Sequence, residues 1–197
     1  IIAPASPAFD PKCVAQGIGV LEELGFRVVL AKHALNKNKY LAGSDAQRVT
    51  DLCEMFKDPH IDGLVCLRGG YGSMRILHRI DYHAIRHNPK VLVGYSDITA
   101  LQLAIWKKTR LVTFSGPMLA ADLGCEADGN TLKQFYKALT HPLPLGVIPL
   151  APDVKAEVIN PGRARGRLVG GNLSLVAATL GTPYEINTRG MILFLEE

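Results

Sequence analysis

The chain has 197 residues, of which 48% are hydrophobic and 20% are charged, a composition that excludes a disordered protein and allows a sizeable core. Its 22 basic and 18 acidic residues give a net charge of +4. Because the basic residues are scattered and only 7% of residues are aromatic, we expect no nucleic-acid partner. No apolar run reaches the roughly 18 residues that a membrane-spanning helix needs, so we expect no membrane partner.

Short β-branched runs alternate with amphipathic helices, which is typical of a parallel α/β sheet. Asp10 and Pro11 begin the first predicted helix, and Gly25 ends it. A strand is predicted over 26–31. Residues 44–47 fit a capping box and begin a second helix, whose apolar stripe faces a core.

Two apolar runs in the middle of the chain each end in a turn of small residues. Residues 63–67 predict a strand that leads into the turn 68–73, and residues 91–93 predict a strand that leads into 94–97. Ligands of open parallel sheets bind beyond the C-terminal ends of the strands, so these turns are the expected site. The other elements predicted here are a helix over 74–86, a helix through 98–105, a strand over 111–114 and a helix from 130 or 131 to 139.

A proline-rich segment follows. Five prolines fall within residues 141–165, a density that indicates a linker or an irregular crossover. Beyond it we predict a strand over 166–169, a turn over 170–172 with Asn172 near an N-cap, a helix over 173–180 and a strand over 191–195. We therefore divide the chain into an N-terminal α/β domain with the candidate nucleophile (1–141), a linker (142–165) and the beginning of a C-terminal domain (166–197).

Both ends of the sequence suggest a piece of a longer protein. The first residue is Ile1 and not Met, and the last seven residues are an apolar run that stops at Glu196 and Glu197. A natural C-terminus seldom lies inside a buried strand. We expect the remainder of the C-terminal domain to lie outside this sequence.

The cysteines and histidines suggest neither a metal site nor a redox motif. Cys13, Cys53, Cys66 and Cys125 form no C-x-x-C pair. We expect buried free thiols in preference to disulfides, and hence a reducing compartment. The six histidines lack metal-binding spacing and are expected on surfaces or helix faces: His33, His60, His78, His83, His87 and His141.

Ser96 is the strongest candidate nucleophile. It lies where an apolar strand meets an apolar helix, with Gly94 two residues before it, so its hydroxyl would project from a tight elbow. The backbone N–H of Asp97 would then point toward a developing oxyanion. Ile98 replaces the second glycine of G-x-S-x-G, and the same residues also fit an ordinary helix cap.

The Gly69-Gly70-Tyr71-Gly72 turn is a second candidate. Its glycines allow backbone N–H groups to approach a phosphate, a carboxylate or an oxyanion, although close packing of the turn would need the same residues. Arg68 beside it can hold a substrate carboxylate or form a surface salt bridge. Glu196 can orient a catalytic base, and Glu197 can be an exposed charge.

Several motifs together resemble one family. In chain order they are Ile2-Ala3-Pro4-Ala5-Ser6-Pro7, Leu67-Arg68-Gly69-Gly70-Tyr71-Gly72, Gly94-Tyr95-Ser96-Asp97-Ile98-Thr99-Ala100, Thr113-Phe114-Ser115-Gly116-Pro117-Met118, Gly170-Gly171-Asn172-Leu173 with Gly181-Thr182-Pro183, and Ile192-Leu193-Phe194-Leu195-Glu196. This set resembles the LD-carboxypeptidase family, serine peptidases that include muramoyltetrapeptide carboxypeptidases and microcin C immunity peptidases. The resemblance implies an open, mostly parallel sheet of flavodoxin or glutamine-amidotransferase type, followed by a smaller domain.

The resemblance also implies a Ser-Glu-His triad. Ser96 matches the nucleophile, Glu196 the acid, and the amides of Gly70 and Asp97 the oxyanion hole. The family's histidine lies beyond residue 197, so we expect the 197-residue chain alone to be inactive. Arg68 and Tyr71 are candidates for substrate binding.

The expected activity is hydrolysis of an L,D-peptide bond in murein tetrapeptides during wall recycling, without a metal or other cofactor. A cytoplasmic homodimer is expected from the resemblance. Two alternatives stay open: a peptidyl-nucleotide immunity peptidase with the same triad, and a non-catalytic module that binds an anion or peptide at the Gly69–Gly72 turn and the Ser96 helix N-terminus.

Overall fold

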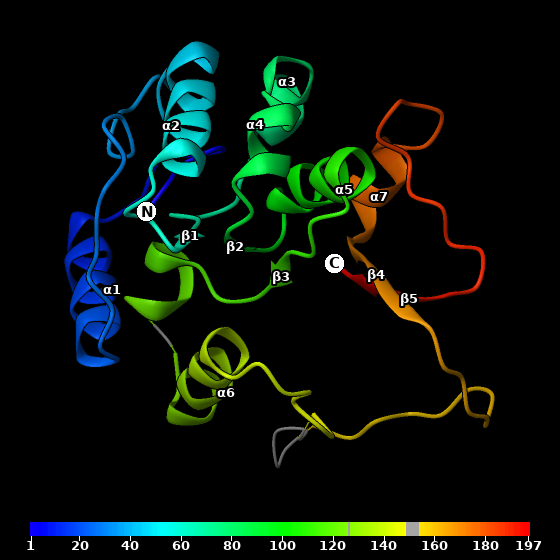
Figure 1. The fold of residues 1–197 in the computed structure, drawn as a ribbon. Helices are drawn as coiled ribbons and strands as arrows, with labels where there is room; N and C mark the ends of the chain where they lie inside the picture. The colour runs from blue at the N-terminus through cyan, green and yellow to red at the C-terminus, as the bar shows by residue number, and fades with distance from the viewer. Residues whose placement is uncertain (126, 149–153) are drawn as a thin grey trace.

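The computed structural model describes residues 1–125, 127–148 and 154–197. Strands β1 (Gly63–Val65), β2 (Val91–Gly94) and β3 (Phe114–Ser115) are parallel and adjacent in that order. A parallel bridge between Ile2 and Cys66 extends the sheet beyond β1. Helices lie above and below these strands in Figure 1, so the expected α/β class is confirmed.

The helices follow local signals in the sequence. Asp10 caps α1 by accepting a hydrogen bond from the Lys12 N–H, at 2.8 Å, and Ser44 and Gln47 form the predicted capping box of α2. The described α-helices are α1 (Pro11–Glu23), α2 (Asp45–Lys57), α3 (Ser73–Ile76), α4 (Tyr82–His87), α5 (Ile98–Thr109), α6 (Gly129–Thr140) and α7 (Leu173–Ala178). In Figure 1, α2, α4 and α5 lie above the strands and α6 lies below them.

Helix α5 is the most deeply embedded of these helices. Every residue from Ile98 to Ile105 is buried. The Gln102 side-chain amide donates to the Gly94 and Phe114 carbonyls, both at 2.8 Å, and so joins the ends of β2 and β3. A buried amide with two such partners is costly to displace, so the N-terminal end of α5 is firmly fixed relative to the sheet.

One predicted strand is not formed and another is shorter than expected. Residues 26–31 form no regular strand. They pair with the N-terminus through two hydrogen bonds, in which the Ile1 amine donates to the Val29 carbonyl and the Ala31 N–H donates to the Ile1 carbonyl. The strand predicted over 111–114 begins only at Phe114, because Arg110 is left-handed and the Leu111 N–H bonds to the Thr109 hydroxyl.

The long helix predicted over 74–86 is also wrong. The structure has α3, a 3-10 turn (Leu77–Arg79) and α4 in its place. Ile80 is extended, and the Asp81 carboxylate accepts from the Ala84 N–H at 2.9 Å. Asp81 is therefore an N-cap that begins a separate helix.

The second sheet consists of β4 (Arg167–Asn172) and β5 (Met191–Glu196), which are parallel. The turn predicted over 170–172 is wrong, because β4 continues through both glycines and pairs Gly170 with Phe194. Asn172 is the N-cap of α7, as expected, and accepts from the Leu175 N–H at 3.2 Å. Gly170 has φ +134°, and a Cβ there would lie 1.8 Å from the Phe194 carbonyl oxygen. The strand pairing thus requires glycine.

Gly170→Ala is expected to lower the free energy of unfolding by about 3 kcal/mol, because the added methyl group meets backbone and the φ is strained. Denaturant titration measures the loss. Gly162→Ala is the matched control, since a Cβ there meets nothing within 4 Å and should cost less than about 0.5 kcal/mol. Equal midpoints for the two variants would contradict the glycine requirement.

The cysteine prediction is wrong for one pair. Cys13 and Cys125 form a disulfide with a Cα–Cα distance of 5.5 Å, although 112 residues separate them. Cys13 lies in α1, and α1 contacts the π-helical turn (Leu119–Leu123) that precedes Cys125, which brings the two sulfurs together. Cys53 and Cys66 are free, and burial raises the pKa of the Cys66 thiol to about 12. The expectation of a reducing compartment rested on four free thiols, and only two of the four cysteines are free.

The crossover from the first sheet to the second is irregular where it is described. Residues 142–148 and 154–165 contain no helix or strand and are mostly exposed. Prolines 149 and 152 lie outside the described residues. No helix within the described ranges is long and apolar enough to cross a membrane.

Candidate active site

Ser96 lies in a strained turn between β2 and α5. Its φ of +58° is left-handed, which costs a residue with a side chain about 1 kcal/mol or more and is often found at functional sites. The Ile98 N–H donates to the Tyr95 carbonyl at 3.1 Å, and the Thr99 N–H donates to the Ser96 carbonyl at 2.9 Å. Ser96 therefore lies at the beginning of α5, where the sequence predicts it.

The replacement of the second elbow glycine by Ile98 has a structural explanation. A Cβ on Gly94 would lie 2.9 Å from the Ile98 side chain. Gly94 thus provides the space that Ile98 occupies. The strand-to-helix elbow is retained despite the departure from G-x-S-x-G.

The glycine turn packs directly on the serine. A Cβ on Gly69 would lie 3.2 Å from Ser96 Oγ and 3.4 Å from the Asp97 backbone nitrogen. Within the described residues, the backbone N–H groups of Gly70 and Asp97 donate to no hydrogen bond. Two unengaged N–H donors beside a serine hydroxyl are what an oxyanion hole requires. Their use in this way stays a prediction.

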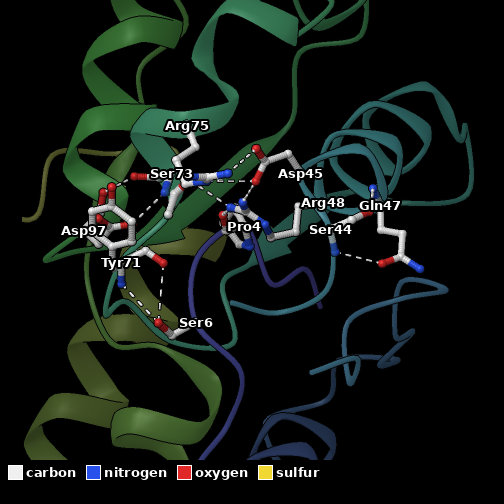
Figure 2. Close-up of polar contacts among 11 residues, drawn as sticks. Pro4, Ser6, Ser44, Asp45, Gln47, Arg48, Tyr71, Ser73, Arg75 and Asp97 are labelled. Carbon is white, nitrogen blue, oxygen red and sulfur yellow. Dashed lines mark hydrogen bonds and ion pairs between the residues drawn. The ribbon is translucent and has the colours of Figure 1, made fainter. Parts of the chain in front are cut away.

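Two serines hold this turn in place (Figure 2). The Ser6 N–H donates to the Gly69 carbonyl at 3.2 Å, and Ser6 Oγ accepts from the Tyr71 N–H at 3.1 Å. The Ser73 N–H donates to Asp97 Oδ2 at 2.9 Å, and its hydroxyl donates to the Asp97 carbonyl. Asp97 thereby connects the glycine turn with the Ser96 elbow.

A buried arginine also supports this turn. Arg48 is only 2% exposed, and its Nη1 donates to the Pro4 carbonyl at 2.5 Å and the Gly72 carbonyl at 2.8 Å. Asp45 pairs with Arg48 and, at 2.9 Å, with Arg75 (Figure 2). The hydrogen bond from Arg75 and the charge of Arg48 lower the pKa of Asp45. Sequence reasoning missed this network, because an arginine on an amphipathic helix usually faces solvent.

The two candidate binding residues lie beside the turn. Arg68 donates to the Pro7 carbonyl at 3.3 Å, and its guanidinium carbon lies 3.6 Å from the Phe9 ring centroid. Among the described residues it has no carboxylate partner, so the surface salt bridge is not formed. Tyr71 is 45% exposed, and its ring lies 5.7 Å from that of Tyr40.

Glu196 is connected to α5, the helix that begins after Ser96, through Asn172. It is the last residue of β5 and pairs in register with Asn172, whose N–H donates to Thr99 Oγ1 at 3.0 Å. Thr99 is in the first turn of α5, three residues after Ser96. The Oε1 atom of Glu196 is buried and has no hydrogen-bond partner in the described structure. A native buried acceptor without a donor requires an explanation.

Glu197 has a different role from its neighbour. Its carboxylate accepts from the Ser174 N–H at 3.0 Å and from the Ser174 hydroxyl at 2.8 Å, at the beginning of α7. Glu197 is therefore engaged, although it is exposed as predicted.

No histidine in the described part of the chain forms a hydrogen bond with Ser96 or Glu196. His33 instead pairs with buried Asp51, at 2.7 Å from Nδ1 to Oδ1. The described residues also contain no group of three or more His, Cys, Asp or Glu side chains that could hold a metal ion. The structure thus brings together Ser96, Gly69, Gly70 and Asp97, and connects them with Glu196, without a base.

Two family models match the chain. The LD-carboxypeptidase N-terminal domain matches residues 1–116, and the LD-carboxypeptidase C-terminal domain matches residues 165–197. The chain belongs to the LD-carboxypeptidase family. The expectation drawn from the scattered motifs is thus confirmed.

Relatives of this LD-carboxypeptidase chain carry two kinds of name. A probable murein peptide carboxypeptidase of Bacillus subtilis (strain 168) is 48% identical over all of the chain and 61% of its own length. A crystal structure of a MccF-like protein from Bacillus anthracis has a TM-score of 0.91, with 35% identity over all of the chain and 65% of that protein. A muramoyltetrapeptide carboxypeptidase from Oxalobacter formigenes has a TM-score of 0.82, with 30% identity over 98% of the chain and 63% of that protein. The chain spans about three fifths of the length of the curated relatives it matches.

Proposed function

We propose that a protein carrying this chain is a serine carboxypeptidase that hydrolyses an L,D-peptide bond and releases a terminal D-amino acid from murein tetrapeptides. The observation that carries the proposal is the strained Ser96 elbow with Gly69 packed against its hydroxyl. The names of the Bacillus subtilis and Oxalobacter formigenes relatives support this substrate class.

In the proposed reaction Ser96 Oγ attacks the carbonyl carbon of the scissile bond. The base that removes its proton is a histidine, which the family resemblance puts beyond residue 197, and Glu196 orients it. The N–H groups of Gly70 and Asp97 stabilise the oxyanion. Collapse of this intermediate expels the amine of the terminal residue and leaves an ester on Ser96, which water then hydrolyses.

The test uses a protein that carries this sequence together with a complete C-terminal domain. Incubation with a tetrapeptide ending in D-Ala should release D-Ala, measured by chiral chromatography. A fluorophosphonate probe should label Ser96, as mapped by peptide mass spectrometry. Anion binding without label or product would favour the non-catalytic binding module, and the 197-residue chain alone should release no D-Ala.

A peptidyl-nucleotide substrate is the second candidate. Solved structures of the microcin C7 self-immunity protein MccF contain adenosine monophosphate or aspartyl sulfamoyl adenosine. MccF of Escherichia coli is 31% identical to this chain in an alignment that includes 92% of the chain. Turnover of a tetrapeptide and of a peptidyl nucleotide should be compared side by side. We expect the tetrapeptide to be preferred.

We further propose the domain division at 1–141, 142–165 and 166–197, a homodimer and a cytoplasmic location. The division is supported by the two separate sheets and by the irregular segment between them. The homodimer and the location rest on the family resemblance. Sedimentation of the complete protein and fractionation of cells test the last two.

A further inference from the structure

Exposed Phe9 and half-buried Arg68 form a pair beside the candidate site. Phe9 is 87% exposed, which is unusual for a large apolar side chain, yet the Arg68 guanidinium carbon lies 3.6 Å from its ring centroid. Phe9 directly precedes Asp10, the N-cap of α1, so the backbone that carries the ring is anchored. A guanidinium stacked on a ring keeps its plane while its edge remains free.

The free edge of Arg68 is available to a ligand. Arg68 Nη1 donates to the Pro7 carbonyl at 3.3 Å. Among the described residues, Nη2 and Nε of Arg68 have no acceptor, and no carboxylate pairs with this side chain. Partial burial lowers the pKa of Arg68, which nevertheless stays protonated at neutral pH. Two neighbouring donors in one plane match the two oxygens of a carboxylate.

The position of Arg68 suits a carboxylate next to the scissile bond. Its Nη2 lies 3.4 Å from where a Gly70 Cβ would be, and a Gly69 Cβ would lie 3.2 Å from Ser96 Oγ. The two glycines are consecutive, so the Arg68 guanidinium and the Ser96 hydroxyl both lie against the same short turn. In a carboxypeptidase substrate, only the amide nitrogen and one α-carbon separate the attacked carbonyl from the terminal carboxylate.

We propose that Arg68 binds the C-terminal carboxylate of the substrate and that Phe9 is a positioning residue, which fixes the plane of the guanidinium. The pair thereby selects peptides that end in a free carboxylate. This inference rests on the proposed attack by Ser96.

The test measures binding in a Ser96→Ala background of the complete protein, so that no chemistry occurs. Calorimetry compares a tetrapeptide ending in D-Ala with the same peptide ending in the D-Ala amide. The free acid should bind about tenfold or more tightly than the amide, the range expected for charged hydrogen bonds. Arg68→Gln should remove this preference. Equal binding of acid and amide in the parent, or an unchanged preference in Arg68→Gln, would overturn the assignment of Arg68.

Phe9 is tested by a matched pair of substitutions. Phe9→Leu retains apolar bulk and removes the ring, and should reduce the acid preference about threefold to fivefold, as expected for loss of a cation–π contact. Phe9→Tyr retains the ring and should retain the preference. Tyr136→Ala, on α6 beneath the sheet in Figure 1, is the control for loss of a surface aromatic residue and should change nothing. An unaltered preference in Phe9→Leu would overturn the positioning role.

Kinetics on the active protein add a second readout. Because the carboxylate contact exists in both the substrate complex and the transition state, Phe9→Leu should raise KM and leave kcat within about twofold. A fall in kcat with constant KM would contradict a role in carboxylate binding. If the unsubstituted protein releases no D-Ala but still prefers the acid, the proposed function fails while the inference on Arg68 survives.

Discussion

Ser96→Ala is expected to reduce D-Ala release by about 10⁴-fold or more, because removal of a nucleophile abolishes the acyl-enzyme route. The rate is measured with a murein tetrapeptide on the complete protein, by single-turnover kinetics at high enzyme concentration. Retention of more than a tenth of the activity would exclude Ser96 as the nucleophile.

Stability provides the control for this substitution. Ser96 has a left-handed backbone, and glycine adopts this conformation without strain. Ser96→Gly should therefore be as inactive as Ser96→Ala and about 1 kcal/mol more stable than it in denaturant titrations. Inactivity with retained stability separates loss of chemistry from loss of fold.

Glu196→Gln is expected to lower kcat by about 10²- to 10⁴-fold, the range for loss of a residue that orients a catalytic histidine. The buried Oε1 atom of Glu196 lacks a donor in the described structure, which suits an acceptor that an imidazole N–H completes. Glutamine is neutral, and in one of its two amide orientations it puts an NH2 donor where the histidine N–H needs an acceptor. Rates are measured with the same tetrapeptide.

Glu197→Gln is the matched control for Glu196. It makes the same carboxylate-to-amide change at the adjacent residue, but the Glu197 carboxylate accepts hydrogen bonds from Ser174 at the beginning of α7. We expect kcat within about threefold of the parent and a stability loss of about 1 kcal/mol or less, the cost of weakening a helix-end contact. The opposite pattern, with Glu197 essential and Glu196 dispensable, would exchange the two assignments.

Elements with short-range causes could be predicted from the sequence. The caps of α1 and α2 are formed by side chains that bond to backbone within three residues, and the Ser96 elbow follows from a strand, a glycine and a helix that are contiguous. The strand before Arg68 also lies in a continuous apolar run, although only Leu64 of its three residues is buried. In each case one window of sequence contains both partners of the interaction.

The missed features depend on contacts between distant segments. Ser6 and Tyr71 are 65 residues apart, Arg48 and Pro4 are 44 apart, and Cys13 and Cys125 are 112 apart. Nothing local to Arg48 distinguishes it from a solvated helix residue. The predictions of a longer β3 and of one continuous helix before β2 were wrong for another reason. The Thr109 hydroxyl accepts from the Leu111 N–H, and the Asp81 carboxylate accepts from the Ala84 N–H, so these N–H groups are not used as the predicted elements required.

The hydrogen bond between Asn172 and Thr99 has a consequence for how such a protein tolerates change. It fixes the second sheet directly on the first turn of α5, so the spacing of Ser96 and Glu196 does not depend on the length of the proline-rich crossover between them. Loop lengthening costs little free energy when the ends are anchored elsewhere. Insertions near Val158 or Gly162, which lie in exposed chain without regular structure, should therefore be accepted, and this crossover is the natural place to fuse a reporter without separating Ser96 from Glu196.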